Sequence, residues 1–446
     1  MIIPSIMADK TVAVLGLGRS GLAACHALVK AGAVVMGHDD GLNARPNDMP
    51  LEAAMTAPEA WPWQDLDYIV ISPGIPHHFP TPHPVAQKAM ESGVPVVSDI
   101  EMLMLAKPKA KVIGITGTNG KSTVVTLIDH LLRAAGIKTA LGGNIGVAAL
   151  GLTDPGQDGV IVLELSSYQL ETTPSLALDA GAVVNITPDH LDRHGGWDGY
   201  VAAKANLVKA VKPAGLTVLG PQEAAAALSA FAASPVTIAD PAAAPDRRSC
   251  PALSGPHNAV NTVIASEMVK FLGGDDDTIT AALATFKGLP HRMETLSSID
   301  GITFINDSKA TNGDAAAEAL KTFENIYWIA GGFAKDDGLG VAADHLDHVQ
   351  RAYMIGASAE QFADQVKHHC PVVISHHLEA ATQSALDDAQ KDALNNATVL
   401  LSPAAASFDQ FKNFEMRGDR FRAIVTSLSS DLSGGLSAAV SEASHD

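Results

Sequence analysis

Short apolar runs, each ending at a polar or glycine-rich segment, recur along the chain. The first run, residues 12–15, leads into a glycine turn, a segment with helical spacing as far as Gly32, and a second apolar run that ends at Asp39. Short apolar runs separated by helix-length segments are typical of a parallel sheet with crossover helices. The pattern therefore predicts an α/β fold, and further runs at residues 68–72 and 94–97 complete a first unit.

The same alternation predicts a second and a third α/β unit. In the second unit, a helix is predicted after a glycine loop, and strands are predicted at residues 111–116, 160–163 and 182–186. In the third unit, strands are predicted at residues 302–305, 327–330, 352–355, 372–375 and 398–401. Because 446 residues exceed the size of one ordinary core, we expect three domains: residues 1–98, 99–294 and 295–446.

Composition narrows the class of protein. The formal net charge of −19 argues against a nucleic-acid partner, because such proteins concentrate lysine and arginine on one face. The three cysteines, Cys25, Cys250 and Cys370, are too widely spaced for a disulfide framework or a zinc site, which indicates a reducing compartment. The chain has no signal-peptide pattern and no long apolar run. We therefore expect a cytoplasmic protein without membrane insertion.

A glycine loop between a predicted strand and a predicted helix indicates a phosphate-binding site. The loop and the start of the helix consist of Gly117, Thr118, Asn119, Gly120, Lys121, Ser122 and Thr123. Backbone N–H groups of such a loop can hold phosphate oxygens, the lysine can reach the outer phosphates, and the serine hydroxyl can bind magnesium. The spacing departs from the usual motif, which requires glycine where this chain has Ile115. The alternative is a glycine turn with an incidental lysine.

A second glycine motif opens the chain. Gly16, Gly18 and Gly21 form a complete dinucleotide fingerprint, and Asp39 ends the next predicted strand, where an acidic side chain would bind a ribose hydroxyl. A nicotinamide enzyme would not explain the second phosphate loop. A nucleotide bound at the helix N-terminus, a nicotinamide cofactor and a purely structural turn all stay open at this point.

Polar residues that follow predicted strands are further candidates. Glu164 could hold magnesium beside a triphosphate, or it could be a solvated acid at a strand end. Asp189 and His190 could supply a metal ligand, or they could be ordinary loop residues. Asp307 and Lys309 group a carboxylate with an ammonium, although Asp307 could also be a helix N-cap.

The order of these motifs resembles that of the Mur ligases, and the resemblance covers nearly the whole chain. It is carried by GTNGKST at 117–123, GNIG at 143–146, ELSSYQLE at 164–171, NITPDHLDR at 185–193, HN at 257–258, HRME at 291–294 and DSKATN at 307–312. Residues 401–421 are similar to the members of the family that add D-glutamate.

The resemblance implies a Rossmann-like domain for a UDP moiety, a central ATPase domain with a P-loop, and a C-terminal Rossmann-like domain. It implies that ATP phosphorylates the carboxylate of UDP-N-acetylmuramoyl-L-alanine and that the amine of D-glutamate attacks the acyl phosphate, a step in the synthesis of peptidoglycan precursors. A carboxylate needs such activation, because its oxygen leaves readily only as a phosphate. The partners would be these small molecules, and we expect a monomer.

Family positions carried onto this chain assign roles to individual residues. The resemblance implies ATP contacts from the phosphate loop and from Asn258, Asn261, Arg292, Asp307 and Lys309. It implies two magnesium sites, with ligands from Ser122, Glu164, His190 and Lys204, the last as a carbamate formed with carbon dioxide. Without the resemblance, Lys204 would be interpreted as an ordinary exposed lysine on a helix. Lys121, His190, Lys204 and Lys335 are the implied catalytic residues.

Substrate contacts are implied in the same way. Around the UDP-linked substrate they are Arg19, Ser20, Asp39, Asp40, Ser72, Pro73, Gly74, Asn144 and His190; around D-glutamate they are Thr311, Lys335, Ser407 and Phe414. The chain departs from the family at Phe333, where an acidic residue is common, and the pair Arg19 and Ser20 also varies.

Three alternatives compete with this interpretation. A folylpolyglutamate synthase would lack the glycine turn at residues 16–21, and a ligase that adds L-alanine would typically have histidine at Asn119. A nucleotide sensor without catalytic activity would be expected to lose His190, Lys204 or Lys335, and this chain retains all three.

Overall fold

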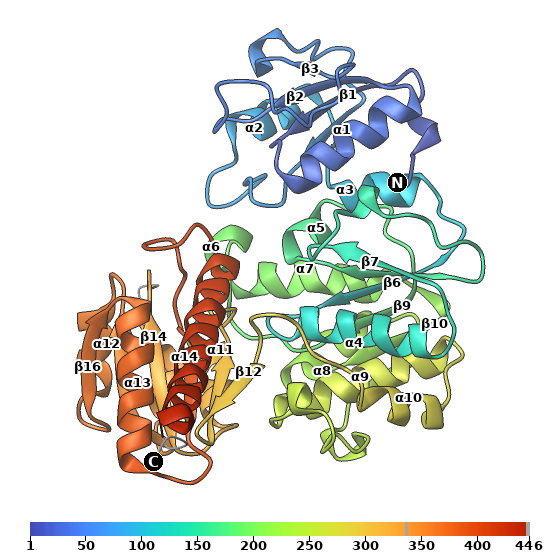
Figure 1. Ribbon diagram of the computed structural model, residues 1–446. Helices are drawn as coiled ribbons and strands as arrows, with labels where there is room; N and C mark the ends of the chain where they lie inside the picture. The colour runs from blue at the N-terminus through green and yellow to red at the C-terminus, as the bar shows by residue number, and fades with distance from the viewer. Residues whose placement is uncertain (335–337, 443–446) are drawn as a thin grey trace. The chain divides into compact units, whose positions relative to one another are not determined.

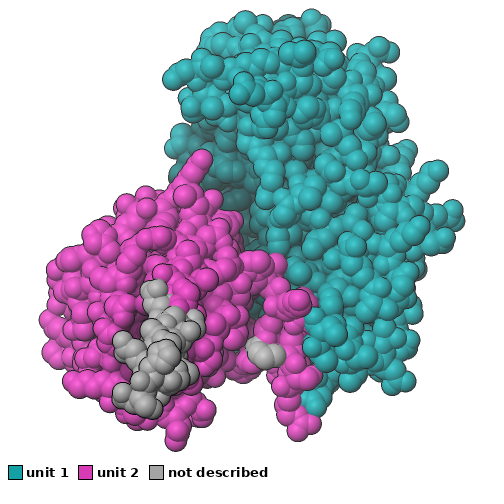
Figure 2. Space-filling model, in the orientation of Figure 1, with its two compact units in different colours: residues 1–246, 260–285 teal, residues 247–259, 286–446 magenta. Residues whose placement is uncertain are grey.

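The computed structural model describes residues 1–334 and 338–442 (Figure 1). The chain divides into two compact units, Met1–Asp246 with Val260–Thr285 and Arg247–Ala259 with Phe286–Asp446 (Figure 2). Across the described residues, no helix combines the length and the apolar character that a membrane span requires.

The first unit begins with a parallel sheet of short strands in the order β3-β2-β1-β4-β5. The strands are β1 (Thr11–Leu15), β2 (Val34–His38), β3 (Ala54–Met55), β4 (Tyr68–Ile71) and β5 (Val96–Val97). The helices around them are η1 (Ser5–Met7), α1 (Arg19–Ala31), η2 (Pro58–Ala60), α2 (Pro84–Ser92) and α3 (Asp99–Leu105).

Both faces of this first sheet are buried. Along β1, Val12 and Val14 belong to one apolar cluster, whereas Ala13 and Leu15 belong to another. Leu28 of α1 is in the first cluster and Val85 of α2 is in the second, so helices cover the sheet on both sides. Burial on both faces explains why the strand is continuously apolar and not alternating.

The second sheet of the first unit is also parallel, with strand order β11-β10-β9-β6-β8-β7. Its strands are β6 (Lys111–Thr116), β7 (Thr139–Gly143), β8 (Val160–Glu164), β9 (Leu178–Val183), β10 (Val211–Leu219) and β11 (Val236–Ile238). Its helices are α4 (Lys121–Ala134), η3 (Ala149–Gly151), α5 (Ser167–Glu171), α6 (Leu191–His194), α7 (Trp197–Lys209), α8 (Glu223–Leu228), η4 (Ser229–Phe231), η5 (Pro241–Ala243), α9 (His257–Phe271) and α10 (Asp276–Leu283). The carboxyl ends of β6, β8 and β9 bring the polar motifs of the middle of the chain to one edge of the sheet.

The third sheet lies in the second unit and has the order β12-β13-β17-β14-β15-β16. Its strands are β12 (Glu294–Ile299), β13 (Ile302–Asn306), β14 (Ile326–Gly331), β15 (Val349–Ile355), β16 (Val372–His376) and β17 (Thr398–Leu401). The helices are η6 (Pro251–Leu253), α11 (Gly313–Leu320), η7 (Gly340–Asp344), α12 (Ala359–Val366), α13 (Leu378–Asp392) and α14 (Phe414–Glu442). Only the pairing of β12 with β13 is antiparallel among the strands described, so the sheet is mixed.

Side chains of β14 alternate between two buried clusters, as those of β1 do. Trp328 packs in a cluster with residues of α11 and α12, and Tyr327 and Ile329 pack in a cluster with residues of α13 and α14. The second unit is therefore also a sheet with helices on both faces.

The α/β prediction is confirmed, and the predicted strands are present, with one misplaced. The strand predicted at residues 182–186 is β9, Leu178–Val183. Val184 and Ile186 are buried but lie beyond the strand, in the loop that supports the phosphate loop, so their apolar character reflects burial and not strand structure. The helix and strand expected within residues 221–245 are α8 and β11, whereas β3, β7, β10 and β12 were not predicted.

Candidate functional site

The first glycine turn joins β1 to the start of α1 at Arg19. A Cβ atom on Gly21 would lie 1.8 Å from the Gly16 carbonyl oxygen, so only glycine allows the helix to approach the strand this closely. A Cβ atom on Gly18 would meet no atom within 4 Å. The backbone at Gly18 therefore faces open space at a helix N-terminus, where a pyrophosphate can be bound by N–H groups.

Residues predicted to surround the nucleotide support this turn. The two carboxylate oxygens of Asp39 accept hydrogen bonds from the backbone N–H groups of Leu17, at 2.7 Å, and of Gly41, at 2.9 Å. The Ser72 hydroxyl donates to the Gly16 carbonyl at 3.0 Å. Asp39 and Ser72 thus hold the loop around the candidate nucleotide site in shape.

Two further charged residues lie at this end of the first sheet. Asp40 contacts His83 at 2.7 Å and His38 at 3.0 Å, and the hydrogen bond from His83 lowers the pKa of the Asp40 carboxyl. The Arg19 guanidinium donates to the Asn144 carbonyl at 3.4 Å, and Ser20 lies beside it in the first turn of α1.

The predicted phosphate loop lies between β6 and α4. Gly120 has φ of +81° and is the N-cap of α4, a conformation that favours glycine. The Asn185 side-chain oxygen accepts hydrogen bonds from the backbone N–H of Thr118, at 3.0 Å, and of Asn119, at 2.9 Å. Ile115, where the usual spacing has glycine, is a buried residue within β6, so the loop starts later than the usual motif requires.

Lys121 and Thr118 connect this loop to its surroundings. The Lys121 ammonium donates to the carbonyl oxygens of Gly117, at 2.8 Å, and of Thr118, at 2.7 Å. The Thr118 hydroxyl donates to the Thr187 carbonyl at 3.0 Å and lies 2.9 Å from the Tyr200 hydroxyl. The lysine is thus held over the loop whose N–H groups would bind phosphate.

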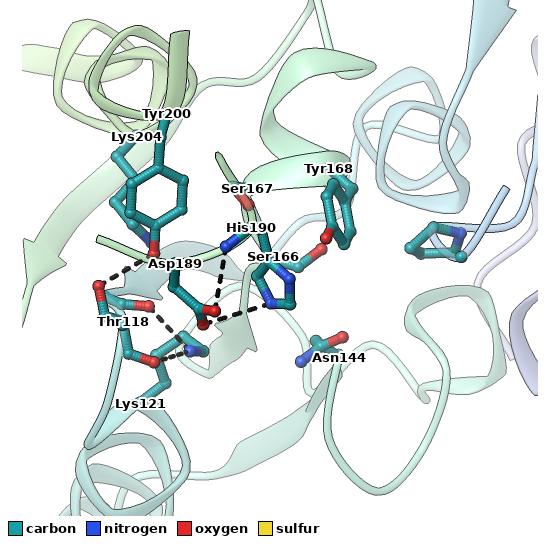
Figure 3. Close-up of a pocket in the computed structure, with 13 residues that line it drawn as sticks. Thr118, Lys121, Asn144, Ser166, Ser167, Tyr168, Asp189, His190, Tyr200 and Lys204 are labelled. Atoms are coloured by element: carbon teal, nitrogen blue, oxygen red, sulfur yellow. Dashed lines mark hydrogen bonds and ion pairs between the residues drawn. The ribbon is translucent and has the colours of Figure 1, made fainter. Parts of the chain in front are cut away.

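A pocket of about 250 Å³ opens beside the phosphate loop (Figure 3). It is lined by Pro73, Gly74, Gly117, Thr118, Lys121, Asn144, Ser166, Ser167, Tyr168, Asp189, His190, Tyr200 and Lys204. The pocket therefore contains the predicted catalytic residues Lys121, His190 and Lys204. It also contains Asp189, and Pro73 and Gly74 of the predicted nucleotide site, and all of these residues belong to the first unit.

Lys204 is buried on α7, contrary to the default interpretation of an exposed helical lysine, with 1% of its surface accessible. Its ammonium lies 3.4 Å from the Thr116 hydroxyl and 4.6 Å from the centre of the Tyr200 ring. Desolvation, followed by repulsion from Lys121, lowers the pKa of Lys204 well below its usual value. Within the described residues, no carboxylate forms a salt bridge with it. The neutral amine is therefore more accessible at this position than in an exposed lysine.

Glu164, at the end of β8, has an unusual environment for a carboxylate. One oxygen accepts a hydrogen bond from the Asn144 amide at 2.7 Å. The other oxygen is buried and has no hydrogen-bond partner among the described residues. A buried carboxylate oxygen without a partner is a suitable ligand for a hard cation. The Ser122 hydroxyl, in the first turn of α4, is a second suitable oxygen.

His190 adopts a left-handed conformation, φ +51°, at the N-cap of α6. Its Nε2 atom lies 3.4 Å from Asp189 Oδ2, and its ring is 5.4 Å from that of Tyr168. No group of three His, Cys, Asp or Glu side chains in the described part of the chain is arranged to hold a metal ion. Side chains other than these types would have to complete any site here.

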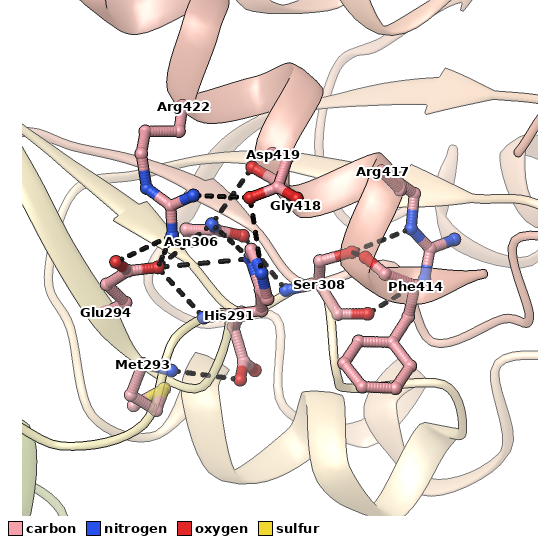
Figure 4. A network of polar contacts seen from close by, with 11 residues as sticks. His291, Met293, Glu294, Asn306, Ser308, Phe414, Arg417, Gly418, Asp419 and Arg422 are labelled. Atoms are coloured by element: carbon pink, nitrogen blue, oxygen red, sulfur yellow. Dashed lines mark hydrogen bonds and ion pairs between the residues drawn. The ribbon is translucent and has the colours of Figure 1, made fainter. Parts of the chain in front are cut away.

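The second unit contains a separate polar network at the ends of β12 and β13 (Figure 4). Both Glu294 oxygens accept hydrogen bonds from the Arg422 guanidinium at 2.9 Å. The Asn306 amide donates to Glu294 at 3.1 Å and lies 3.0 Å from His291 Nδ1. This network fixes the segment that carries Arg292, a predicted ATP contact.

Asp307, another predicted ATP contact, is buried directly after β13. Its carboxylate accepts hydrogen bonds from Ser402 Oγ at 2.9 Å and from the Met293 backbone N–H at 3.1 Å. Burial raises the pKa of Asp307 to about 6, although the Arg292 charge opposes that shift. The Lys309 ammonium lies 3.9 Å from the centre of the Phe414 ring, which joins a predicted ATP ligand to a predicted D-glutamate contact.

The remaining residues predicted to bind ATP or D-glutamate are divided between the two units. Asn258 is buried and donates to the Ser254 carbonyl at 2.7 Å in the second unit. Asn261 belongs to the first unit and faces the phosphate loop, since its Oδ1 atom would be 2.8 Å from a Cβ on Gly120. The others are Thr311 and Ser407, in the second unit, and Lys335, which lies outside the described residues.

Three residues of the site, Tyr200, Thr187 and Asn185, had no predicted role. The sequence gives little reason to select them. Tyr200 is an aromatic residue on a helix, Asn185 and Thr187 are polar residues after a strand, and both patterns are common in any α/β protein. The loop contacts of Asn185 could have been suspected only from its position after β9, beside β6 in the sheet.

Two family models match this chain, the Mur ligase middle domain over residues 115–239 and the Mur ligase glutamate ligase domain over residues 291–405. Among solved structures, the UDP-N-acetylmuramate-alanine ligase of Thermotoga maritima aligns with a TM-score of 0.58 at 16% identity, covering 94% of this chain and 100% of that chain. A pseudomurein peptide ligase type C from Methanothermus fervidus aligns with a TM-score of 0.57 at 17% identity, covering 94% and 100%. The two family models place this chain in the ligase class of α/β enzymes, which uses ATP and magnesium.

Closer relatives define the branch. A protein from Paramagnetospirillum magneticum is 41% identical over 95% of this chain and 98% of its own length. A protein from Novosphingobium aromaticivorans is 42% identical over 97% and 98%. Both carry the name UDP-N-acetylmuramoylalanine--D-glutamate ligase. This chain therefore belongs to the Mur ligase family, in the branch of the UDP-N-acetylmuramoylalanine--D-glutamate ligases.

Proposed function

We propose that this ligase adds D-glutamate to UDP-N-acetylmuramoyl-L-alanine in the synthesis of peptidoglycan precursors. The observation that carries the proposal is the identity of 41% over 95% of this chain with a relative of that name. In this reaction the γ-phosphoryl group of ATP moves to the alanyl carboxylate. The amine of D-glutamate then attacks the carbonyl carbon, the bond to phosphate breaks, the nitrogen loses a proton, and an amide, ADP and phosphate result.

The phosphate loop supports the first step of this reaction. Backbone N–H groups of the loop and the N-terminus of α4 would bind the phosphates of ATP, and the Lys121 ammonium would neutralise charge on the group being transferred. Lys121 already lies within hydrogen-bond distance of the loop carbonyls, so it needs only a change of partner to reach a phosphate. Phosphoryl transfer depends mainly on such positioning and charge neutralisation.

Magnesium would supply further charge neutralisation at the phosphates. We assign one ion to Glu164 and Ser122, because the partnerless Glu164 oxygen and the serine hydroxyl fit a hard cation. We assign a second ion to His190 and to a carbamate on Lys204.

The carbamate follows from the chemistry of a buried amine. A neutral lysine amine adds to carbon dioxide, forms an N–C bond and releases one proton, and the product is an anion where an ammonium would repel a cation. Burial and the lowered pKa of Lys204 support this proposal, because both make the neutral, reactive amine easier to form.

Substrate roles follow the same branch of the family. Asn144 and His190 would hold the muramoyl portion, and the first glycine turn with Arg19, Ser20, Asp39, Asp40 and residues 72–74 would hold the uridine diphosphate. Asn258, Asn261, Arg292, Asp307 and Lys309 would contact ATP, and Thr311, Lys335, Ser407 and Phe414 would contact D-glutamate. We further propose three domains, residues 1–98, 99–294 and 295–446, of which the first and third are Rossmann-like, and a monomeric protein.

Phosphate release tests the proposed reaction. The protein would be mixed with ATP, magnesium and UDP-N-acetylmuramoyl-L-alanine, together with D-glutamate, L-glutamate, L-lysine, meso-diaminopimelate or no amino acid. We expect release that requires D-glutamate. Release that requires another amino acid would keep the ligase and replace the substrate, and no release with any of them would refute the proposed activity.

A pair of variants connects the activity to the phosphate loop. Lys121→Ala should reduce turnover by about 100-fold or more, because a charge that stabilises the transferring phosphoryl group is lost. Lys138→Ala is the matched control, since Lys138 is an exposed lysine of the same unit. Normal turnover by Lys121→Ala would contradict the assignment of the loop.

A further inference from the structure

Three side chains beside the pocket form a continuous hydrogen-bonded chain. The Ser167 hydroxyl lies 2.9 Å from His194 Nε2, and His194 Nδ1 lies 2.8 Å from Glu171 Oε1. Ser167 begins α5, Glu171 ends it, and His194 ends α6. The His194 side chain is 0% exposed, so water does not compete for either nitrogen.

The carboxylate of Glu171 determines which atoms donate and which accept in these hydrogen bonds. A carboxylate only accepts, so His194 Nδ1 carries a proton and donates it to Glu171. In the neutral ring, Nε2 is then the acceptor, and the Ser167 hydroxyl donates to it. The serine proton is therefore directed into the protein, and the lone pairs of its oxygen remain for another donor.

Neighbouring aromatic rings fix the histidine in this position. The Tyr168 ring stacks on His194, with 5.3 Å between centres and 12° between planes, and the Tyr200 ring lies 5.3 Å away at 53°. A ring packed on two sides and bonded at both nitrogens cannot rotate without breaking these contacts. The orientation of the Ser167 hydroxyl is thus built into the fold.

Ser167 also lines the pocket, where it is labelled beside Ser166 and Tyr168 in Figure 3. Lys121, Lys204 and the Asn144 amide line the same pocket, and each of them can offer N–H donors. A serine oxygen that is held as an acceptor differs from them, because it selects a ligand with an N–H group of its own. The proposed substrate has such a group, the amide N–H of its alanyl residue, next to the carboxylate that reacts.

We propose that Glu171 and His194 orient Ser167 so that its oxygen accepts the alanyl N–H of the bound UDP-linked substrate. The inference rests on the proposed function and names a specificity-determining contact within it. Ser167 touches the substrate, whereas His194 and Glu171 are positioning residues that act through it. The contact favours an amide over an ester at this position of the substrate.

The test replaces the substrate N–H by oxygen. The probe is an analogue in which L-lactate replaces L-alanine, so that an ester stands where the amide was. We expect wild-type protein to show a 3- to 10-fold higher KM for the analogue, about the value of one neutral hydrogen bond, with the KM for ATP unchanged. Ser167→Ala should raise the KM for the normal substrate by the same factor and should no longer distinguish the two compounds.

Two histidine variants separate positioning from structural support. His194→Gln can place an amide oxygen near the position of Nε2 and accept from Ser167, so it should retain the preference for the amide. His194→Asn can replace only the Nδ1 contact with Glu171, so it should lose the preference. Ser266→Ala is the matched control, because Ser266 is a buried serine of the same unit outside the pocket lining.

The outcomes are distinct. Equal KM values of Ser167→Ala and wild type for the amide substrate, or an unchanged preference for amide over ester in Ser167→Ala, would overturn the inference. Loss of the preference in Ser167→Ala and in His194→Asn, but not in His194→Gln, would support it. Failure of the wild-type protein to use UDP-N-acetylmuramoyl-L-alanine with D-glutamate would instead refute the proposed function, because every comparison starts from that activity.

Discussion

Lys204 shows how the surroundings of one residue determine its chemistry. An exposed lysine is almost entirely protonated at neutral pH, whereas desolvation on α7 and the nearby Lys121 charge lower the pKa of Lys204 and make its ammonium easier to deprotonate. The carbamate proposed at this position can therefore be tested by removing the amine and supplying a carboxylate from solution.

Lys204→Ala should lower turnover by about 100-fold, because a ligand in the cation site is lost. Added formate or acetate should restore part of the activity, since a small carboxylate can occupy the space left by the side chain and its carbamate. The measurement is phosphate release as a function of the concentration of added acid. Lys209→Ala, an exposed lysine on the same helix, is the control and should respond to neither change. Full activity of Lys204→Ala, or no recovery with either acid, would contradict the role.

Asp307 is expected to make stability depend on pH. Burial raises its pKa to about 6 in the folded protein, compared with about 3.9 in an unfolded chain, so the folded state binds this proton more tightly. Its contribution to the free energy of unfolding is therefore complete below about pH 3.9 and is lost as the pH rises through about 6.

Asp307→Asn should remove this dependence, because an amide of similar shape is not ionised. At pH 8 the variant should be more stable than the wild type by about 1 to 3 kcal/mol, and the difference should shrink towards pH 4. Urea unfolding of both proteins at pH 4, 6 and 8 measures it. The control is Asp347→Asn, at an exposed aspartate of the same unit. A difference that is constant over this range would refute the pKa argument.

The sequence predicted several residues of the pocket but not the contacts between them. Lys121, Asn144, His190 and Lys204 were placed by motif order, and all four line one pocket. The Ser167 contact with His194 spans 27 positions and depends on where α5 and α6 meet, so no local spacing reveals it.

At the scale of secondary structure, α14 supports the loops at the carboxyl ends of three strands. The Arg417 guanidinium donates to the backbone oxygens of Ser308 at 2.9 Å, Ala405 at 3.0 Å and Gly331 at 3.4 Å, and to the Ser308 hydroxyl at 3.0 Å. These acceptors follow or end β13, β17 and β14. Arg417 is 1% exposed, and burial lowers its pKa to about 10.

Arg417→Lys should lower the free energy of unfolding by about 2 to 4 kcal/mol. A lysine keeps the charge but cannot reach several carbonyl groups with one planar fork, so buried acceptors would lose their partners. Chemical denaturation measures the change. Arg420→Lys, on the same helix, is the matched control: Arg420 is half exposed and pairs with Glu379, so its replacement should change stability by less than about 1 kcal/mol. Equal effects of both substitutions would contradict the account.

Strands and helices were predicted well where the apolar residues form a continuous run or a helical period, and poorly where polar residues, proline or glycine interrupt that run. The strand β6 and the helix α4 follow from an apolar run, a glycine loop and a helical period. In contrast, β10 contains Lys212, Pro213 and Gly215, and only its second half is apolar, so its length could not be predicted from propensity. The edge strand β12 has only two apolar residues, Leu296 and Ile299, and pairs antiparallel, so a search for continuous buried runs overlooks it.

At the scale of the whole molecule, we expect one chain per particle. The net charge of −19 favours mutual repulsion, and the proposed reaction needs only residues of one chain. Sedimentation velocity over a 100-fold range of protein concentration should give one species with the mass of a single chain. A mass that increases with concentration would refute this prediction, and repeating the measurement at high salt would show whether charge repulsion prevents association.

The second unit is not continuous in sequence, since residues 247–259 belong to it and residues 260–285 return to the first unit. A ribosome delivers the chain in order from the N-terminus. Every residue of the first unit has therefore emerged once residue 285 has left the exit tunnel, whereas residues 247–259 wait for more than a hundred further residues before their own sheet can form. During synthesis, the nascent protein thus carries a segment whose partners do not yet exist, and a chain that stops early would expose that segment to proteases and chaperones.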